Sequence, residues 1–128
     1  MNKFLRLMFA LVILAMLGAT VLQLFFPDYM GSHSGYGVAY GWQREIAFWD
    51  MAVLIILVAV NIKYDWFYLQ VVLLALSVGG ICIGTNHLVY FMARHSLING
   101  IGAAENYLLV LGWFIGWIIE NKHRKSRA

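Results

Sequence analysis

A few polar side chains lie within or beside long apolar runs of this 128-residue chain, where polar groups are costly. His87, preceded by Asn86, interrupts the apolar stretch 79–91. An imidazole among carboxyl and amide groups can bind a polar ligand, relay protons or coordinate a metal. The candidate ligand-binding residues are Gln43, Glu45, Asp50, Asn86, His87, Glu105 and Asn106.

A metal site is one use of this set. His87, Asp50 and Glu105 are the candidate ligands, because imidazole and carboxylate suit a divalent metal or an iron pair, and helical bundles hold such sites between facing helices. His87 is not part of the Glu-x-x-His spacing that such sites use, and no cofactor is clearly implied by the sequence. A hydrogen-bonded network that fixes the register of the helices would use the same residues without any ligand.

The composition indicates which elements must position these residues. The chain is 62% hydrophobic and 12% charged, whereas soluble domains are about 45–50% apolar and about 25% charged. About 20 apolar residues span a bilayer as a helix, which satisfies its own backbone. We therefore expect an all-α membrane protein: an antiparallel four-transmembrane-helix bundle forming a single domain over residues 1–128. The expected spans are about 7–26, 42–62, 66–92 and 103–119.

The charges at the chain ends predict the orientation. Lys3 and Arg6 precede the first span, and the basic tail 122–127 follows the last one. Because basic residues favour the cytoplasmic side, we expect a multi-pass protein of the bacterial inner membrane with both termini cytoplasmic. The apolar run continues past the candidate signal-peptide cleavage site near Ala19, so we expect an uncleaved first span that ends at Pro27.

This topology places the candidate residues at one depth. Gln43, Glu45 and Asp50 lie in the outer half of the second span. His87 lies near the outer end of the third span, and Glu105 lies in the first turn or two of the fourth span. An outer loop over 94–100 joins the last two spans. A stripe of small residues at helical spacing leads to His87 and predicts a closely packed face: Ser77, Gly80 and Gly84.

Several classes of function find no support in the sequence. The single cysteine, Cys82, excludes an intrachain disulfide, and we expect a buried, inert thiol. No phosphate loop or nucleophile elbow is present, so no catalytic residue is assigned. The basic residues flank the spans, which implies contact with the lipid bilayer and no nucleic acid. A homo-oligomer or a membrane partner stays open.

Three functions remain for an inner-membrane protein with a His/carboxylate cluster. One is a transporter subunit for a small ion, a proton or a small molecule, which would use Asp50, Glu105 and His87. A second is partner binding or assembly, including immunity to a toxin, through the loop 28–41. The third and weakest is a metal-dependent membrane enzyme.

Two segments carry a family resemblance. They are Trp42-Gln43-Arg44-Glu45-Ile46-Ala47-Phe48-Trp49-Asp50-Met51-Ala52 and Ile83-Gly84-Thr85-Asn86-His87-Leu88. They resemble the opening of one span and the ending of the next in small bacterial four-helix membrane proteins of unknown function, the DUF6790-like and more loosely the DoxX-like families. The resemblance implies a four-helix membrane bundle and no activity. It points to Gln43, Glu45, Asp50 and His87 as the matching positions.

Overall fold

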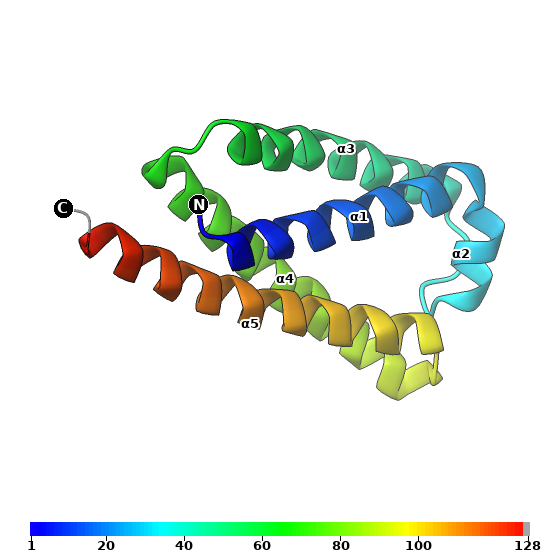
Figure 1. The fold of residues 1–128 in the computed structure, drawn as a ribbon. Coiled ribbons are helices and arrows are strands. Elements are labelled where there is room, and N and C mark those ends of the chain that lie inside the picture. The colour runs from blue at the N-terminus through cyan, green and yellow to red at the C-terminus, as the bar shows by residue number, and fades with distance from the viewer. Residues whose placement is uncertain (127–128) are drawn as a thin grey trace.

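Over residues 1–126, a computed structural model shows a chain built from α-helices (Figure 1). The five helices are α1 (Lys3–Phe25), α2 (Pro27–His33), α3 (Tyr40–Ile62), α4 (Trp66–Arg94) and α5 (Leu97–Lys125). All except α2 are long and apolar enough to cross a membrane. The predictions of an all-helical chain and of four long apolar helices are therefore confirmed.

The connections between the helices differ from the prediction in two places. The loop expected over 28–41 contains α2, which begins at Pro27, a residue suited to the first turn because it lacks an N–H group. The loop expected over 94–100 is wrong, because α5 already begins at Leu97. There the Ser96 hydroxyl accepts a hydrogen bond from the Asn99 backbone N–H at 3.4 Å and caps the helix.

The long helices pack as two pairs that α1 joins. α1 lies against α3, α4 lies against α5, and α1 also contacts α5, whereas α3 and α4 contact each other far less (Figure 1). The shared core contains fully buried side chains from three of these helices: Leu5, Phe9, Leu57, Leu69 and Leu73. The close contacts of these side chains hold the helices together.

Glycines allow α5 to approach its two neighbours closely. A Cβ atom at Gly116 would lie 2.8 Å from Leu5 Cδ1 of α1, and one at Gly80 would lie 2.7 Å from Val110 Cγ2 of α5. Gly84 faces α5 in the same way. The small-residue stripe along α4 is thus a helix-packing face, as its spacing predicts.

Much of the apolar surface of the long helices is left uncovered. Ile62 is 82% exposed and Trp49 is 73% exposed. Cys82 is also exposed, so the prediction of a buried thiol is wrong. It lies on α4 outside the stripe that faces α5. Uncovered apolar area on this scale normally marks a surface that contacts lipid or another protein.

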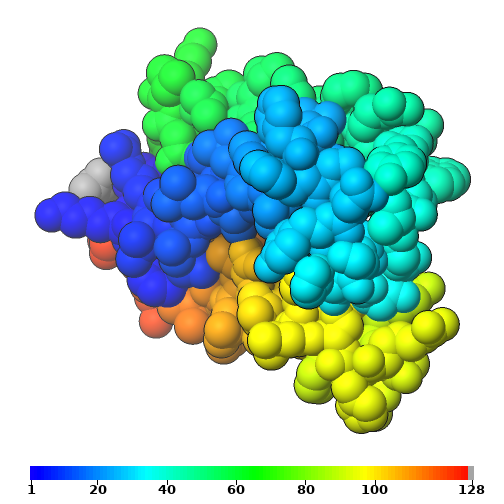
Figure 2. Space-filling model, turned by 90° about the vertical axis from the view of Figure 1, so that its right-hand side faces the viewer, coloured from blue at the N-terminus to red at the C-terminus, as the bar shows by residue number. Residues whose placement is uncertain are grey.

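The molecule has two distinct ends along the helix axes. We call one the terminal end: the N-terminus and the last turn of α5 lie there, together with the α3–α4 connection (Figure 1). We call the other the loop end: it holds α2, the loop 34–39 and the α4–α5 connection. Figure 2 shows the α2 segment seated against the start of α5 at this end.

Candidate functional site

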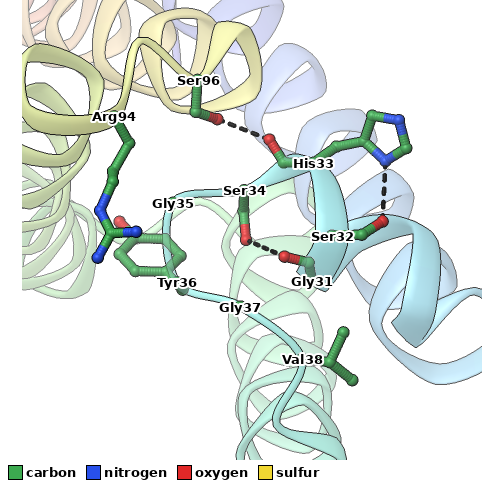
Figure 3. Close-up of a pocket in the computed structure, with 10 residues that line it drawn as sticks. All are labelled: Gly31, Ser32, His33, Ser34, Gly35, Tyr36, Gly37, Val38, Arg94 and Ser96. Atoms are coloured by element: carbon green, nitrogen blue, oxygen red, sulfur yellow. Dashed lines mark hydrogen bonds between the residues drawn. The ribbon is translucent and has the colours of Figure 1, made fainter.

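The loop end carries an open recess of about 490 Å³ (Figure 3). α2 and the following loop supply most of its wall, and the α4–α5 connection supplies the rest. Its lining residues are Gly31, Ser32, His33, Ser34, Gly35, Tyr36, Gly37, Val38, Arg94 and Ser96. Three of these side chains are serine hydroxymethyl groups, each of which donates to a backbone carbonyl, and none is acidic, so the lining carries no negative charge.

Two hydrogen bonds fasten this loop to the start of α5. The Gly35 backbone N–H donates to Asn99 Oδ1 at 2.5 Å. The Ser96 hydroxyl donates to the His33 carbonyl at 2.7 Å (Figure 3). Gly37 follows with φ of 79°, a left-handed conformation that glycine adopts without steric cost. The loop is therefore held by side chains of another helix rather than by its own backbone alone.

Behind the recess lies a polar cluster that we call the His87 network: Tyr36, Asn86, His87 and Asn99. The Tyr36 hydroxyl lies 3.1 Å from His87 Nδ1 and accepts a hydrogen bond from Asn86 Nδ2, also at 3.1 Å. Asn99 Nδ2 lies 3.1 Å from the same His87 nitrogen. Burial raises the pKa of the Tyr36 phenol above its ordinary value, and its hydrogen bond with Asn99 opposes that shift. Tyr36 thus links the recess to residues of α4 and α5.

The hydrogen bonds define the protonation of His87. Asn99 Oδ1 accepts from Gly35, which orients the amide so that its NH₂ group faces His87. An amide NH₂ only donates, so Nδ1 is the acceptor and the ring proton lies on Nε2. The ring lies against Gly102, where a Cβ atom would come within 3.0 Å of Nε2. His87 is therefore a neutral imidazole that positions the loop.

Two side chains of the recess, Arg94 and His33, have nitrogen atoms that are free to hydrogen-bond to a ligand. Arg94 makes no ion pair or side-chain hydrogen bond with any residue in 1–126. His33 Nδ1 lies 2.9 Å from the Tyr29 carbonyl and donates to it, which leaves Nε2 free as an acceptor. The recess thus has one unpaired positive charge at its rim.

The predicted residues other than the carboxylates have identifiable partners. Asn86 and His87 belong to the His87 network. Gln43 is buried, accepts from the Ala39 backbone N–H at 3.1 Å and donates to the Pro27 carbonyl at 2.8 Å, so it ties α2 to α3. Asn106 donates to a carbonyl of its own helix, that of Gly102.

The three predicted carboxylates are not brought together. Glu45 is exposed, whereas Asp50 and Glu105 are half-buried, and none of them hydrogen-bonds to a residue in 1–126. In that part of the chain, no three His, Cys, Asp or Glu side chains form a group able to hold a metal ion. The hypothetical metal set of His87, Asp50 and Glu105 is thus not assembled. Because α5 begins at Leu97, Glu105 lies in its third turn, deeper than predicted.

Sequence reasoning missed three side chains of the candidate site. Asn99 is fully buried at the centre of the His87 network, although it falls in the segment predicted to be a loop. Arg94 and Tyr36 fall in segments predicted to be connections and carried no motif. The signal that could have found Asn99 is the Ser96 cap three residues before it, which places Asn99 inside a helix.

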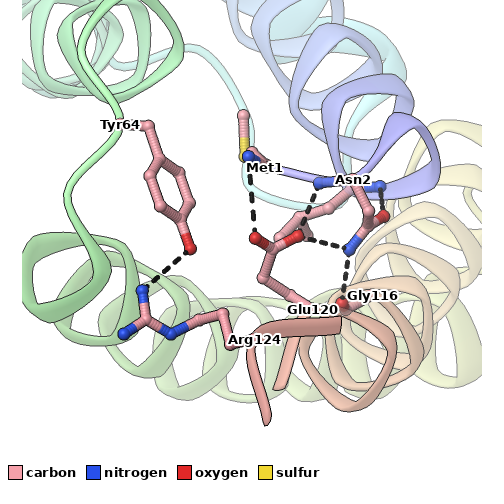
Figure 4. A network of polar contacts seen from close by, with 7 residues as sticks. Met1, Asn2, Tyr64, Gly116, Glu120 and Arg124 are labelled. Atoms are coloured by element: carbon pink, nitrogen blue, oxygen red, sulfur yellow. Dashed lines mark hydrogen bonds and ion pairs between the residues drawn. The ribbon is translucent and has the colours of Figure 1, made fainter. Parts of the chain in front are cut away.

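A second polar network occupies the terminal end (Figure 4). The Glu120 carboxylate accepts from the Asn2 backbone N–H at 2.5 Å and from Asn2 Nδ2 at 3.0 Å, and it lies 3.6 Å from the Met1 ammonium. Beside it, Arg124 Nη1 donates to the Tyr64 hydroxyl at 3.4 Å. Burial raises the pKa of the Tyr64 phenol. We call Met1, Asn2 and Glu120 with Tyr64 and Arg124 the Glu120 network.

No protein-family model matches this chain, and no curated protein or solved structure does so either. The resemblance to the DUF6790-like and DoxX-like families stays a prediction. The functional argument depends on the geometry of the two ends.

Proposed function

We propose that this chain is a four-span protein of the bacterial inner membrane that binds a small anion from the outer side, in the recess at the loop end. The observation that carries the proposal is the unpaired guanidinium of Arg94 at the rim of an open recess without acidic lining. Such a guanidinium recognises carboxylate or phosphate oxygens, often through two parallel hydrogen bonds.

The membrane location is supported by the four long apolar helices and by their uncovered surface. In this proposal the helices form an antiparallel bundle. The terminal end carries Lys3, Arg6 and a basic last turn of α5, so the positive-inside rule makes it cytoplasmic. The loop end then faces outward, and the recess opens to the outer solution.

The residues of the recess have different roles in this proposal. Arg94 supplies the charge and the donors for the anion. The hydroxyl groups of Ser32, Ser34 and Ser96 donate to backbone carbonyls and so hold the surrounding wall in shape. His87 does not touch the ligand. It holds the Tyr36 hydroxyl and so keeps the loop wall in place. A wall fixed before binding reduces the entropy lost when a ligand is bound.

Thermal unfolding of the detergent-purified protein tests this proposal, with inorganic phosphate, acetate and succinate as probes. We expect at least one of these anions to raise the unfolding temperature of the wild type, because a ligand that binds only the folded state stabilises it. Arg94→Gln should abolish that rise. Arg44→Gln is the matched control, since Arg44 lies near the start of α3 and does not line the recess. No rise with any probe, or the same rise in Arg94→Gln, would contradict the proposal.

Ion handling is a second candidate function, supported by a different observation. Asp50 of α3 and Glu105 of α5 are half-buried and have no hydrogen-bond partner within residues 1–126. Carboxylates at membrane depth without partners often mark an ion or proton path. In proteoliposomes, Asp50→Asn and Glu105→Gln should then reduce proton or sodium flux. A flux that neither substitution changes removes this candidate.

A further inference from the structure

A groove of about 400 Å³ runs between α4 and α5 at the terminal end, away from the recess. We propose that it binds an anionic phospholipid, with the lipid phosphate beside Arg124 and an acyl chain along α5. This inference rests on the membrane location proposed above. Its lining residues are Trp66, Gln70, Phe114, Trp117, Ile118 and Asn121.

The lining of the groove matches the two parts of a phospholipid. Phe114 and Ile118 are exposed apolar side chains at successive turns of α5, so they offer a strip along which an acyl chain can lie. The amides of Gln70 and Asn121 have no hydrogen-bond partner within residues 1–126. An amide facing an apolar medium requires a partner, and the ester and phosphate oxygens of a lipid headgroup accept such bonds.

Arg124 is held beside the groove with its charge unpaired. Its guanidinium carbon lies 4.7 Å from the centroid of the Trp66 ring, which lines the groove, and its Nη1 donates to the Tyr64 hydroxyl at 3.4 Å. It forms no ion pair with a carboxylate in the described residues. The cation–π contact therefore places a positive charge at the mouth of the groove while its remaining donors stay available.

The surrounding charge favours an anionic headgroup. The last turn of α5 contains Lys122, His123, Arg124 and Lys125. The carboxylates at this end are already used: Glu120 accepts from Asn2, and Asp65 accepts from the Tyr68 backbone N–H at the start of α4. Basic pockets between spanning helices on the cytoplasmic side are suited to anionic lipid headgroups.

Native mass spectrometry of the delipidated protein in detergent tests the site, with phosphatidylglycerol and phosphatidylcholine added separately. We expect the protein to retain phosphatidylglycerol in preference to phosphatidylcholine. Arg124→Gln should lower the retained phosphatidylglycerol about fivefold, the effect of one basic side chain near an anionic surface. Lys125→Gln is the matched control, because it removes the same charge from the same turn without touching Trp66.

Equal retention of the two lipids, or equal loss in Arg124→Gln and Lys125→Gln, would overturn the lipid site. Gln70→Leu, which leaves Arg124 in place, should also lower the retention of phosphatidylglycerol and covers the case in which Arg124→Gln fails to fold. The membrane location is tested separately: release of the protein from cell membranes by alkaline carbonate would contradict it. Anion binding in the recess would be contradicted if no anion raised the unfolding temperature of the protein with Arg94 intact.

Discussion

Each end of the molecule joins distant segments of the chain through a polar network, and the two networks differ in their chemistry. At the loop end, the His87 network joins a loop to two helices through neutral amide, imidazole and phenol groups. At the terminal end, the Glu120 network joins α5 to the start of α1 through a carboxylate that is 5% exposed. Both networks connect segments that lie far apart in the chain.

The comparison shows how each end leaves a guanidinium unpaired. At the terminal end, Asn2 and the Met1 ammonium occupy the Glu120 carboxylate, so Arg124 beside it has no ion pair within the described residues. At the loop end, the network uses no charge, and the charge of Arg94 stays unpaired in front of it. At both ends the polar network stabilises the fold without pairing the nearby guanidinium with a carboxylate, so that guanidinium is left for a ligand.

Glu120→Ala should have the largest effect on stability. It leaves the Asn2 backbone N–H and the Met1 ammonium without their acceptor in a mostly buried site. We expect a loss of about 3 kcal/mol in the free energy of unfolding, typical of breaking a buried ion pair. Denaturant-induced unfolding in detergent micelles, followed by circular dichroism, measures it.

The matched control for this change is Glu105→Ala on the same helix. Glu105 is half-buried but has no hydrogen-bond partner within residues 1–126, so its loss should change the unfolding free energy little. Equal losses in the two variants would show that Glu120 acts through burial alone, and the contrast between the ends would disappear.

Asn99→Ala should have the next largest effect, centred on the loop end. The change removes the acceptor of the Gly35 N–H group and the donor to His87, and it leaves space in a fully buried position. We expect a loss of about 2 kcal/mol, because a partly buried N–H group would lack a partner. The anion-induced thermal shift should disappear at the same time.

Asn61→Ala is the control for that variant. Its amide donates only to the Leu57 carbonyl of its own helix, so we expect a loss of less than about 1 kcal/mol. If Asn99→Ala kept the anion-induced shift while losing stability, the His87 network would be a purely structural feature unrelated to the recess.

The sequence alone predicts the long helices well, and the reason is physical. Apolar runs of bilayer length must be helical in lipid, and Pro27 ends the first of them wherever the other helices lie. The glycine stripe also follows from the sequence, because Gly80 and Gly84 share a face at helical spacing whatever their partner is. These features depend on neighbours within one helix.

The candidate site could be predicted only in part, because its contacts join distant segments. His87 and Asn86 are conspicuous as polar residues in an apolar run. Their partner Tyr36 lies about 50 positions away in the chain, on a loop whose path is set by α2. Depth along a helix brings Asp50 and Glu105 to a similar level but says nothing of the separation of their helices. The weak contact between α3 and α4 is a property of packing that no local pattern contains.

Gly80→Ala should give a smaller loss and tests whether the α4–α5 interface couples the two ends. Its Cβ atom would lie 2.7 Å from Val110 Cγ2, so the helices must shift at a cost of about 1 kcal/mol. Gly79→Ala is the adjacent control, since a Cβ there meets nothing within 4 Å. Its higher helix propensity should leave the unfolding free energy unchanged or slightly raised. Identical behaviour of the two variants would contradict the packing described for the stripe.

The smallest expected effect is on the free energy of unfolding at alkaline pH, where the tyrosines of the two ends should behave differently. Burial raises the pKa of Tyr36 and of Tyr64, so each stabilises the fold below its ordinary pKa of about 10 and loses that contribution as the pH rises through its folded value. The consequences of ionisation differ. A Tyr36 phenolate would have no proton to donate to His87 Nδ1. A Tyr64 phenolate would be repelled by the Glu120 carboxylate but would still accept from Arg124.

The free energy of unfolding should decrease as the pH rises above about 10. We therefore expect Tyr36→Phe to reduce this decrease more than Tyr64→Phe does, each by less than about 1 kcal/mol. Unfolding curves of the wild type and both variants, measured on either side of about pH 10, provide the comparison. A larger reduction in Tyr64→Phe would mean that the Arg124 contact does not stabilise the phenolate. In that case the terminal end, and not the loop end, would be the more sensitive to base.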